Sequence, residues 1–155
     1  MTTATIKIYT DGASTGNPGP GGFGAILSYA GKTKELSAGF RLTTNNRMEL
    51  LAVIEALRAI KNPEIPIEIY SDSQYVVNAI DKGWVFGWEK KGFKDKKNKD
   101  LWKEFLKLYP KFKIKMNWVR GHNGHPQNER CDELATTAAI RPEFVDEGYE
   151  KGWGD

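Results

Sequence analysis

The stretch "YTDGASTGNPGPGGFGA" (residues 9–25) marks the place where a first strand ends and the chain turns back. A run of β-formers leads to Asp11, and six glycines and two prolines follow it. A P-loop would need a Lys after its glycines, and a dinucleotide fingerprint would have to open a helix. Residues 23–29 have instead the composition of a second strand. From this stretch alone, an ordinary loop with a surface aspartate is the favoured interpretation, and nucleotide binding is disfavoured.

Outward from this stretch, the pattern predicts one α/β domain over residues 1–141 and a loosely ordered tail over residues 142–155. Gly-containing turns join three strands, which favours an antiparallel meander. A later strand–helix–strand order implies a parallel, right-handed crossover beside it. The predicted strands lie at about 5–11, 22–30, 33–42, 65–71 and 113–119, and the predicted helices at about 45–62, 72–80, 101–109 and 126–140.

Composition limits the class of protein. The 155 residues suit one domain with a substantial core. There is no apolar run long enough to span a bilayer and no signal-peptide pattern, so we expect a cytoplasmic protein without a membrane partner. The single cysteine, Cys131, excludes an internal disulfide and fits a reducing compartment. It is also the only thiolate available beside His122 and His125, which disfavours a zinc site.

A basic segment indicates a polyanionic partner. "EKKGFKDKKNK" (89–99) holds six lysines between Lys90 and Lys99 in a chain of net charge +3. Such a run is usually a solvated face. Aromatic side chains flank this one, and aromatic faces pack against sugars or bases while lysines neutralise phosphates. The flanking aromatic residues are Trp84, Phe86, Trp88, Phe93 and Trp102.

Four acidic residues have both a structural and a chemical interpretation. Asp72 could cap the helix that follows it, Glu49 could form a capping box with Asn46, and Asp132 could complement a helix dipole. Helical periodicity, however, places Glu49 on the apolar face of its helix, and Asp132 shares a face with small alanines. Asp11 and Asp72 lie at predicted strand ends, where sites in open α/β sheets assemble.

Carboxylates gathered in this way would repel one another unless a cation joined them. Oxygen ligands without thiolates suit Mg²⁺ or Mn²⁺. Two Mg²⁺ ions about 3.5–4 Å apart can activate a water and stabilise the leaving oxygen of a phosphodiester.

Four motifs then resemble, in order and spacing, those of bacterial type 1 ribonuclease H: "TDGASTGNPGPGG", "TTNNRMEL", "SDSQYV" and "VRGHNGHPQNERCDELA". The resemblance runs from Ile6 to about Tyr149. It implies a ribonuclease H-like fold, a five-stranded mixed sheet with helices on both faces. It also implies an endonuclease that cuts the RNA strand of RNA–DNA hybrids by two-metal-ion catalysis, leaving 5′-phosphate and 3′-hydroxyl ends. The implied cofactor is Mg²⁺, with Mn²⁺ as a substitute and two ions in each substrate-bound site.

The resemblance also implies roles for individual residues. The metal ligands fall on Asp11, Glu49, Asp72 and Asp132, and a catalytic loop histidine falls on His122. Residues 82–100 match a basic substrate-binding handle, in which Trp84 packs on a DNA sugar and simple packing is favoured for Trp88. The remaining implied substrate contacts are Asn17, Asn45 and Gln74 in the RNA minor groove, Lys90 and Lys91 in the handle, and Thr44 and Asn98 in a DNA-phosphate pocket.

Departures from the family pattern raise further questions. The handle is a few residues shorter, and Glu89 stands where a lysine is expected, which points to lower hybrid affinity. In the phosphate pocket Leu42 replaces an arginine, and Arg41 lies one place earlier. Either a local bulge restores Arg41 to the pocket or the pocket works without it.

Two other function classes stay open from sequence: a hybrid-binding module without activity, and a resolvase or integrase core of the same fold. The favoured interpretation is a monomeric enzyme that acts on RNA–DNA hybrid without an obligate protein partner.

Overall fold

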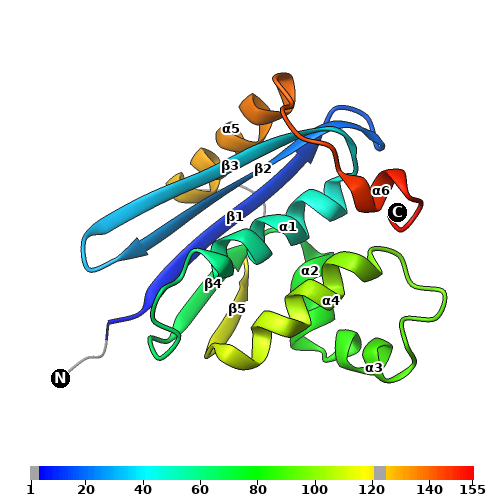
Figure 1. Ribbon diagram of the computed structural model, residues 1–155. Helices are drawn as coiled ribbons and strands as arrows, with labels where there is room; N and C mark the ends of the chain where they lie inside the picture. Colours follow the sequence, from blue (N-terminus) through cyan, green and yellow to red (C-terminus); the bar gives the residue numbers. More distant parts are fainter. Residues whose placement is uncertain (1–3, 121–124) are drawn as a thin grey trace.

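The computed structural model describes residues 4–120 and 125–155, and it shows a five-stranded sheet with helices on both faces (Figure 1). The strand order is β3-β2-β1-β4-β5. The pairs β1–β2 and β2–β3 are antiparallel, whereas β1–β4 and β4–β5 are parallel. The predicted mixed sheet is therefore confirmed. The strands are β1 (Ile6–Ser14), β2 (Gly19–Tyr29), β3 (Lys32–Thr43), β4 (Ile67–Ser71) and β5 (Ile114–Trp118).

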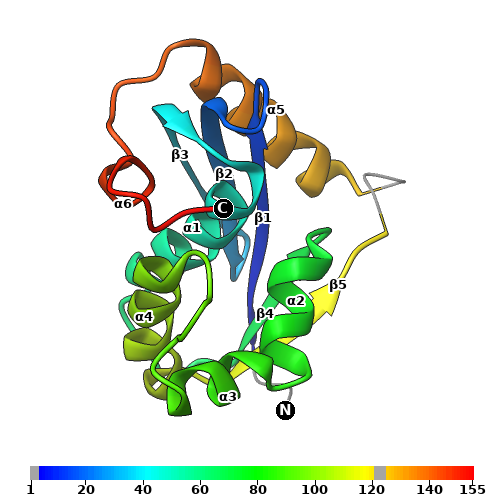
Figure 2. The same ribbon diagram turned by 90° about the vertical axis from the view of Figure 1, so that its right-hand side faces the viewer.

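Two faces of the sheet carry different helices. α5 packs on one face, while α1 covers the other with α2, α3 and α4 beside it (Figures 1 and 2). None of the helices in the described part of the chain is long and apolar enough to cross a membrane. The helices are α1 (Asn45–Arg58), α2 (Gln74–Asp81), α3 (Trp84–Lys90), α4 (Lys99–Leu108), α5 (Pro126–Ile140) and α6 (Glu147–Glu150), with a 3₁₀ turn at Tyr109–Lys111.

Glycines let both helical layers approach the sheet closely. A Cβ atom on Gly12 of β1 would lie 2.4 Å from the backbone nitrogen of Glu49 in α1. On the opposite face, Cβ atoms on Gly22 and Gly24 would lie 2.5 and 2.3 Å from backbone oxygens of α5. No side chain fits in so short a gap. The Gly-rich stretch thus provides the surface on which α1 and α5 pack.

The inward face predicted for α1 is confirmed. Thr44 caps the helix by accepting a hydrogen bond from the backbone nitrogen of Arg47. Val53 and Ala56, which share a face with Glu49, are fully buried. The helix ends at Arg58, earlier than predicted. The backbone N–H of Ala59 is shared between the carbonyls three and four residues back, and that of Ile60 bonds only three residues back, which tightens the last turn.

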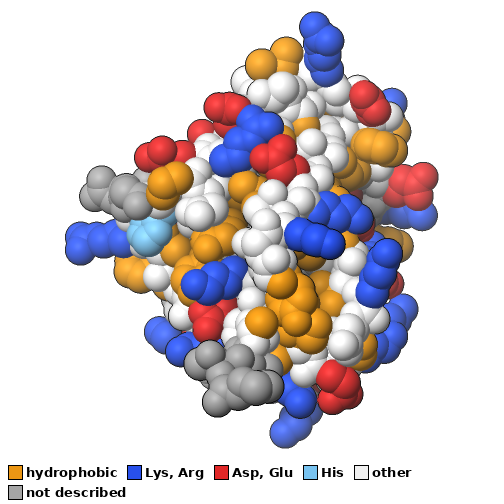
Figure 3. Space-filling view, turned by 90° about the vertical axis from the view of Figure 1, so that its left-hand side faces the viewer, with side chains coloured by type: hydrophobic (Ala, Val, Ile, Leu, Met, Phe, Trp, Pro, Cys, Tyr) orange, Lys and Arg blue, Asp and Glu red, His pale blue; other side chains and the backbone are white. Residues whose placement is uncertain are grey.

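The basic segment contains a helix that the periodicity does not predict. α3 is only seven residues long and has Gly87 in its middle, so it offers no repeating apolar pattern. Trp88 packs edge-on against Trp102, with ring centroids 5.9 Å apart, which confirms the packing role favoured for it. The surface at the left of Figure 1 intersperses charges of both signs around apolar patches (Figure 3). In residues 89–99, by contrast, lysines outnumber acids six to two.

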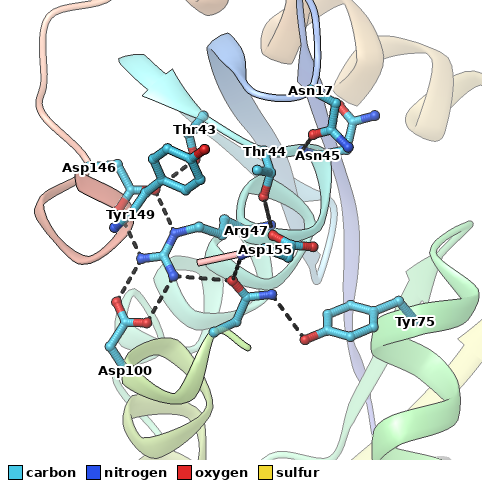
Figure 4. A network of polar contacts seen from close by, with 11 residues as sticks. Asn17, Thr43, Thr44, Asn45, Arg47, Tyr75, Asp100, Asp146, Tyr149 and Asp155 are labelled. Atoms are coloured by element: carbon cyan, nitrogen blue, oxygen red, sulfur yellow. Dashed lines mark hydrogen bonds and ion pairs between the residues drawn. The ribbon is translucent and has the colours of Figure 1, made fainter. Parts of the chain in front are cut away.

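Loose order is the wrong prediction for residues 142–155. This tail forms α6 and returns to α1, where Asp146 is buried against Arg47. The Arg47 side chain is 1% exposed, and a guanidinium so deeply buried requires carboxylate partners. Asp146 and Asp100 supply them, with N–O distances of 2.7 and 2.6 Å (Figure 4). The need to neutralise Arg47 therefore orders the tail.

Asp146 has a depressed pKa. Burial opposes its ionisation, but hydrogen bonds from Arg47 and Thr43 and the positive charge of Arg47 outweigh burial and hold the pKa below its ordinary value of 3.8. Asp146 therefore contributes stability that is fully present above pH 3.8 and is lost as the pH falls through the lowered pKa.

We predict that Asp146→Asn lowers the free energy of unfolding at pH 7 by about 2–3 kcal/mol, because it weakens charge-assisted hydrogen bonds in a buried site. Urea unfolding measures the change. Glu143→Gln removes the same charge from an exposed position of the tail and should change stability by less than about 0.5 kcal/mol. The difference in free energy of unfolding between the unaltered chain and Asp146→Asn should become smaller in acid. A difference that grew in acid would contradict the pKa assigned to Asp146.

Candidate metal centre

Three acidic side chains from separate elements meet where β1 and β4 lie side by side. Asp11 belongs to β1, Glu49 to α1, and Asp72 follows β4 directly. One carboxylate oxygen from each lies within 4.8 Å of the others. The parallel register pairs Tyr9 with Tyr70, so Asp11 and Asp72 stand at equivalent positions two residues further along. β1 continues to Ser14, so Asp11 lies inside a strand and not at its tip as predicted.

Helix capping does not explain these acids. Ser73, not Asp72, is the N-cap of α2, and Thr44, not Asn46, is the N-cap of α1. Since α1 begins two residues earlier than a capping box with Glu49 requires, Glu49 is left without that role. Asp132 is the seventh residue of α5, beyond the first turn, where an acid complements the helix dipole most strongly.

This arrangement changes the pKa of Glu49. Glu49 is 9% exposed, and Asp11 is 3% exposed. Burial, then the charge of Asp11, then the charge of Asp72 raise the pKa of Glu49 well above its ordinary value. Its Oε2 atom is buried and accepts no hydrogen bond from any residue that the structure describes. The arrangement therefore disfavours three ionised carboxylates in the absence of a cation.

The donor set fits a hard divalent cation. Mg²⁺ binds carboxylate oxygens at about 2.0–2.1 Å, so two oxygens on one ion lie at most about 4.2 Å apart. The observed span of 4.8 Å needs only a small side-chain adjustment to bring the three oxygens onto one ion. All three ligands are oxygens, and within residues 4–120 and 125–155 no thiolate or imidazole belongs to the group. This chemistry selects Mg²⁺ or Mn²⁺ over zinc.

Another predicted metal ligand, Asp132, is not part of this group. Asp132 is half-buried on α5, and its carboxylate is not among the three that converge. Its neighbour Cys131 donates a hydrogen bond from Sγ to the carbonyl of Tyr9 at 3.2 Å, which fixes α5 against β1. Burial raises the pKa of Cys131 to about 12, as expected for an unreactive buried thiol. His122 lies outside the described residues.

Two of the residues predicted to contact RNA, Asn17 and Asn45, lie at the start of α1. The Oδ1 atom of Asn17 accepts a hydrogen bond from the backbone nitrogen of Asn45 at 3.0 Å (Figure 4). The Ser14 hydroxyl donates to Asn45 Oδ1 at 2.8 Å. The Gly-rich turn and the N-terminus of α1 thus hold each other in place. Gln74 is exposed at the start of α2, directly after Asp72 and Ser73.

The handle presents one open aromatic ring and several lysines. Trp84 is 47% exposed, and the ammonium group of Lys82 lies 5.2 Å from its ring centroid. Lys90 and Lys91 are exposed at the end of α3. Unlike Trp88, Trp84 therefore keeps a surface that a sugar or base can contact.

The predicted phosphate pocket brings Thr44 and Asn98 to the same place. Both are buried, and Asn98 accepts a hydrogen bond from Arg47 Nη1 at 3.3 Å. A register shift between β2 and β3 inserts one extra residue in β3 between Phe40 and Thr43, so the bulge considered for Arg41 is present. The Arg41 guanidinium, however, is bound to Glu150 through two hydrogen bonds of 3.0 and 2.7 Å.

Two residues near these sites escape sequence reasoning. Trp118, at the end of β5, is 47% exposed and donates its indole N–H to the backbone carbonyl of Asp72 at 3.2 Å. A bulky exposed aromatic on an alternating edge strand is the only sequence signal for it. Asp155 contacts Thr44, and no local pattern predicts that contact because 111 residues separate the two.

Comparisons with known proteins agree with this geometry. The family model described as RNase H matches residues 3–140. A ribonuclease H of Desulforamulus reducens is 56% identical over 88% of this chain and 89% of its own length, and one of Escherichia coli O139:H28 is 51% identical over 94% and 96%.

Among solved structures, LC9-RNase H1 matches with a TM-score of 0.80 and 35% identity, over 97% of this chain and 81% of that chain. LC11-RNase H1, solved in complex with an RNA/DNA hybrid, matches with a TM-score of 0.62 and 27% identity, over 88% and 97%.

We predict that Mg²⁺ raises the melting temperature, because it binds the folded carboxylate group and not the unfolded chain. At ten times its dissociation constant the ion adds about 1.4 kcal/mol of stability, which corresponds to about 3–6 °C. Differential scanning calorimetry with and without Mg²⁺ measures this shift.

Asp72→Asn should remove most of the Mg²⁺-induced shift and raise the melting temperature of the metal-free protein, because it relieves repulsion. Asp81→Asn, an exposed position on α2, is the matched control and should leave the shift unchanged. A metal-free Asp72→Asn protein less stable than the control would contradict mutual repulsion in the group.

Proposed function

The chain belongs to the RNase H family, and we propose that it is a divalent-metal-dependent endonuclease that hydrolyses the RNA strand of RNA–DNA hybrids to 5′-phosphate and 3′-hydroxyl ends. The observation that carries the proposal is the convergence of Asp11, Glu49 and Asp72. A module that only bound nucleic acid would gain nothing from buried acids that repel phosphate. The carboxylates are therefore best explained by catalysis.

In this proposal Asp11, Glu49 and Asp72 hold the divalent ions, and Asp132 joins them from α5. Two such ions, when bound, lower the pKa of a water and neutralise charge on the phosphate oxygens. Glu49 lies against β1, where burial keeps its carboxyl group in one position. Trp118 fixes the backbone of Asp72 through its indole N–H. His122 accepts a proton from the attacking water or assists product release.

Discrimination of RNA from DNA is assigned to polar side chains beside the metal centre. Asn17, Asn45 and Gln74 contact the RNA minor groove, where 2′-hydroxyl groups both donate and accept hydrogen bonds. Hydrogen bonds support the role, because the backbone of Asn45 orients the Asn17 side chain (Figure 4) and the Ser14 hydroxyl orients that of Asn45. The hybrid complex of LC11-RNase H1 supports this substrate class.

The DNA strand is assigned to the handle and to the start of α1. Trp84 packs on a deoxyribose, where a 2′-hydroxyl would clash, and Lys90 and Lys91 neutralise backbone phosphates. Thr44 and Asn98 bind a DNA phosphate. Arg41 is not needed for this pocket, since Glu150 already binds its guanidinium.

We also propose that the enzyme acts as a monomer in the cytoplasm, without an obligate protein partner. Its single buried cysteine supports a reducing compartment. Light scattering on the purified protein tests the monomeric state.

Cleavage of a labelled RNA–DNA hybrid with Mg²⁺ tests the function, beside the same RNA in an RNA duplex. We expect cleavage of the hybrid alone and a loss of activity of at least about 10³-fold in Asp72→Asn, because one metal ligand is lost. Asp81→Asn should retain full activity. Hybrid binding without cleavage by the unaltered chain would reduce the protein to a binding module, and cleavage of duplex DNA would favour a resolvase-like activity.

Salt dependence tests the handle. If Lys90 and Lys91 each neutralise one phosphate, replacing both with Gln should lower the slope of log K against log salt by about 1.8 in magnitude. Fluorescence anisotropy with a labelled hybrid measures the slope in Asp72→Asn protein, which does not cleave it. Lys32 and Lys34, exposed on β3, provide a matched control pair. An equal change in both pairs would show a long-range charge effect and not contact.

A further inference from the structure

Asp155 is bound at the start of α1 by the residues assigned to the phosphate pocket. Its Oδ1 accepts a hydrogen bond from the Thr44 hydroxyl at 2.5 Å, and its Oδ2 accepts one from the Asn46 amide at 2.7 Å. Its backbone nitrogen donates to Asn98 Oδ1 at 3.3 Å. Figure 4 shows this side chain beside Thr44, between the N-terminus of α1 and the Arg47 guanidinium.

The two groups that donate to the Asp155 carboxylate, the Thr44 hydroxyl and the Asn46 side-chain amide, form an anion site, and Asn98 positions the Asp155 backbone beside it. Thr44 is 1% exposed and Asn98 is fully buried, so their positions are set by the fold. Asn98 donates to the Tyr75 hydroxyl at 3.1 Å, and Tyr75 also accepts from the Trp102 indole at 2.8 Å. The site lies at a helix N-terminus, where the backbone dipoles favour negative charge. Each oxygen of the Asp155 carboxylate accepts from a different donor, and two oxygens of a phosphate could be bound in the same way.

Further contacts hold residues 152–155, the segment that carries Asp155, against the rest of the protein. The backbone nitrogen of Asn98 donates to the Trp153 carbonyl at 2.7 Å. The Trp153 ring lies under the ammonium groups of Lys99 and Lys151, at 5.9 and 5.4 Å. Gly154 passes so close to its neighbours that a Cβ atom there would lie 2.5 Å from the Tyr149 ring and 2.9 Å from Arg47 Cδ.

Acidic side chains of the tail also form ion pairs with arginines near the pocket. Residues 142–155 contain five acids and one lysine, in a chain whose net charge is +3. Glu150 pairs with Arg41 and Asp146 with Arg47, the two arginines nearest in sequence to Thr44. An acidic segment thus occupies the part of the surface where the backbone of a nucleic acid would need cationic and hydrogen-bonding groups.

We propose that Asp155 is an internal ligand of this anion site and competes there with a phosphate of the DNA strand. The competition with DNA rests on the proposed function. Thr44 lies five residues before Glu49, about 7.5 Å along the helix axis, so a duplex at the metal centre extends over this pocket within a few base pairs. Binding of the hybrid therefore displaces the Asp155 carboxylate, and the tail weakens substrate binding in the absence of any regulator.

The size of the effect follows from the fraction of molecules in which the pocket is open. If Asp155 occupies the pocket in nine molecules of ten, the apparent dissociation constant of the hybrid rises about tenfold. Removal of the contact should lower Kd and KM by the same factor. It should leave kcat unchanged, because the metal ligands are not altered.

Two variants disrupt the contact in different ways. Asp155→Asn removes the charge and keeps the shape, whereas Gly154→Val displaces the segment by steric overlap and leaves the charge of the chain unchanged. Glu143→Gln removes one exposed charge of the tail away from these contacts and reports any long-range effect of charge. Fluorescence anisotropy with a labelled RNA–DNA hybrid, on proteins that also carry Asp72→Asn, measures binding without cleavage.

We expect both Asp155→Asn and Gly154→Val to tighten hybrid binding by about three- to tenfold, and Glu143→Gln to leave it within about twofold. If Asp155→Asn and Glu143→Gln tightened hybrid binding equally and Gly154→Val did not tighten it, the proposal would be overturned in favour of general charge repulsion. Unchanged binding in both pocket variants would overturn it while leaving the proposed nuclease activity intact.

A second probe does not depend on the proposed nuclease activity. Inorganic phosphate, titrated while the backbone amides of Thr44 and Asn46 are followed by NMR, should bind Asp155→Asn more tightly than the unaltered chain. Equal phosphate affinity in the two proteins would show that Asp155 does not occupy an anion site, whatever the nuclease assay finds.

Discussion

Close packing of α1 on β1 at Gly12 determines where the candidate catalytic groups lie. The gap is too short for any side chain, since a Cβ atom on Gly12 would lie 2.4 Å from the backbone of Glu49. The residues on either side of this contact, Asp11 and Glu49, are therefore brought together by backbone geometry and not by attraction between them. Asp72 arrives from the parallel neighbour β4 at the same level. The fold thus holds three carboxyl groups together, and the divalent cation that we propose to bind there would compensate for the repulsion between their charges.

The same helix also links the metal centre to the rest of the proposed substrate surface. Its N-terminal residues Thr44 and Asn45 face the Gly-rich turn and the phosphate pocket, while Arg47 ties the helix to α4 through Asp100 and to the tail through Asp146. Buried ion pairs often contribute little net stability, but they fix orientation when every partner is hydrogen-bonded. Movement of α1 would disturb the carboxylates and the pocket together, so a single buried guanidinium helps to position both.

Local periodicity and strand alternation predicted what depends on neighbours in sequence. The antiparallel meander and the inward row of α1 that includes Glu49 follow from patterns a few residues long. The convergence of Asp11, Glu49 and Asp72 was inferred because each acid had a predicted face or strand end. The structure added what depends on distant partners: the extension of β1 to Ser14, the ordered tail and the contact of Asp155 with Thr44. Arg47 and Asp146 are 99 residues apart, and nothing in either local sequence indicates that they pair.

A crystal of the unaltered protein soaked in Mn²⁺ tests the central claim most directly, because anomalous scattering locates the ion independently of activity. We predict an anomalous peak within coordination distance of carboxylate oxygens from Asp11, Glu49 and Asp72. Its absence in crystals of the Asp72→Asn protein under the same conditions would identify the ligands. A Mn²⁺ peak elsewhere on the protein, with none between these three side chains, would contradict the assignment of the acidic group as a metal centre.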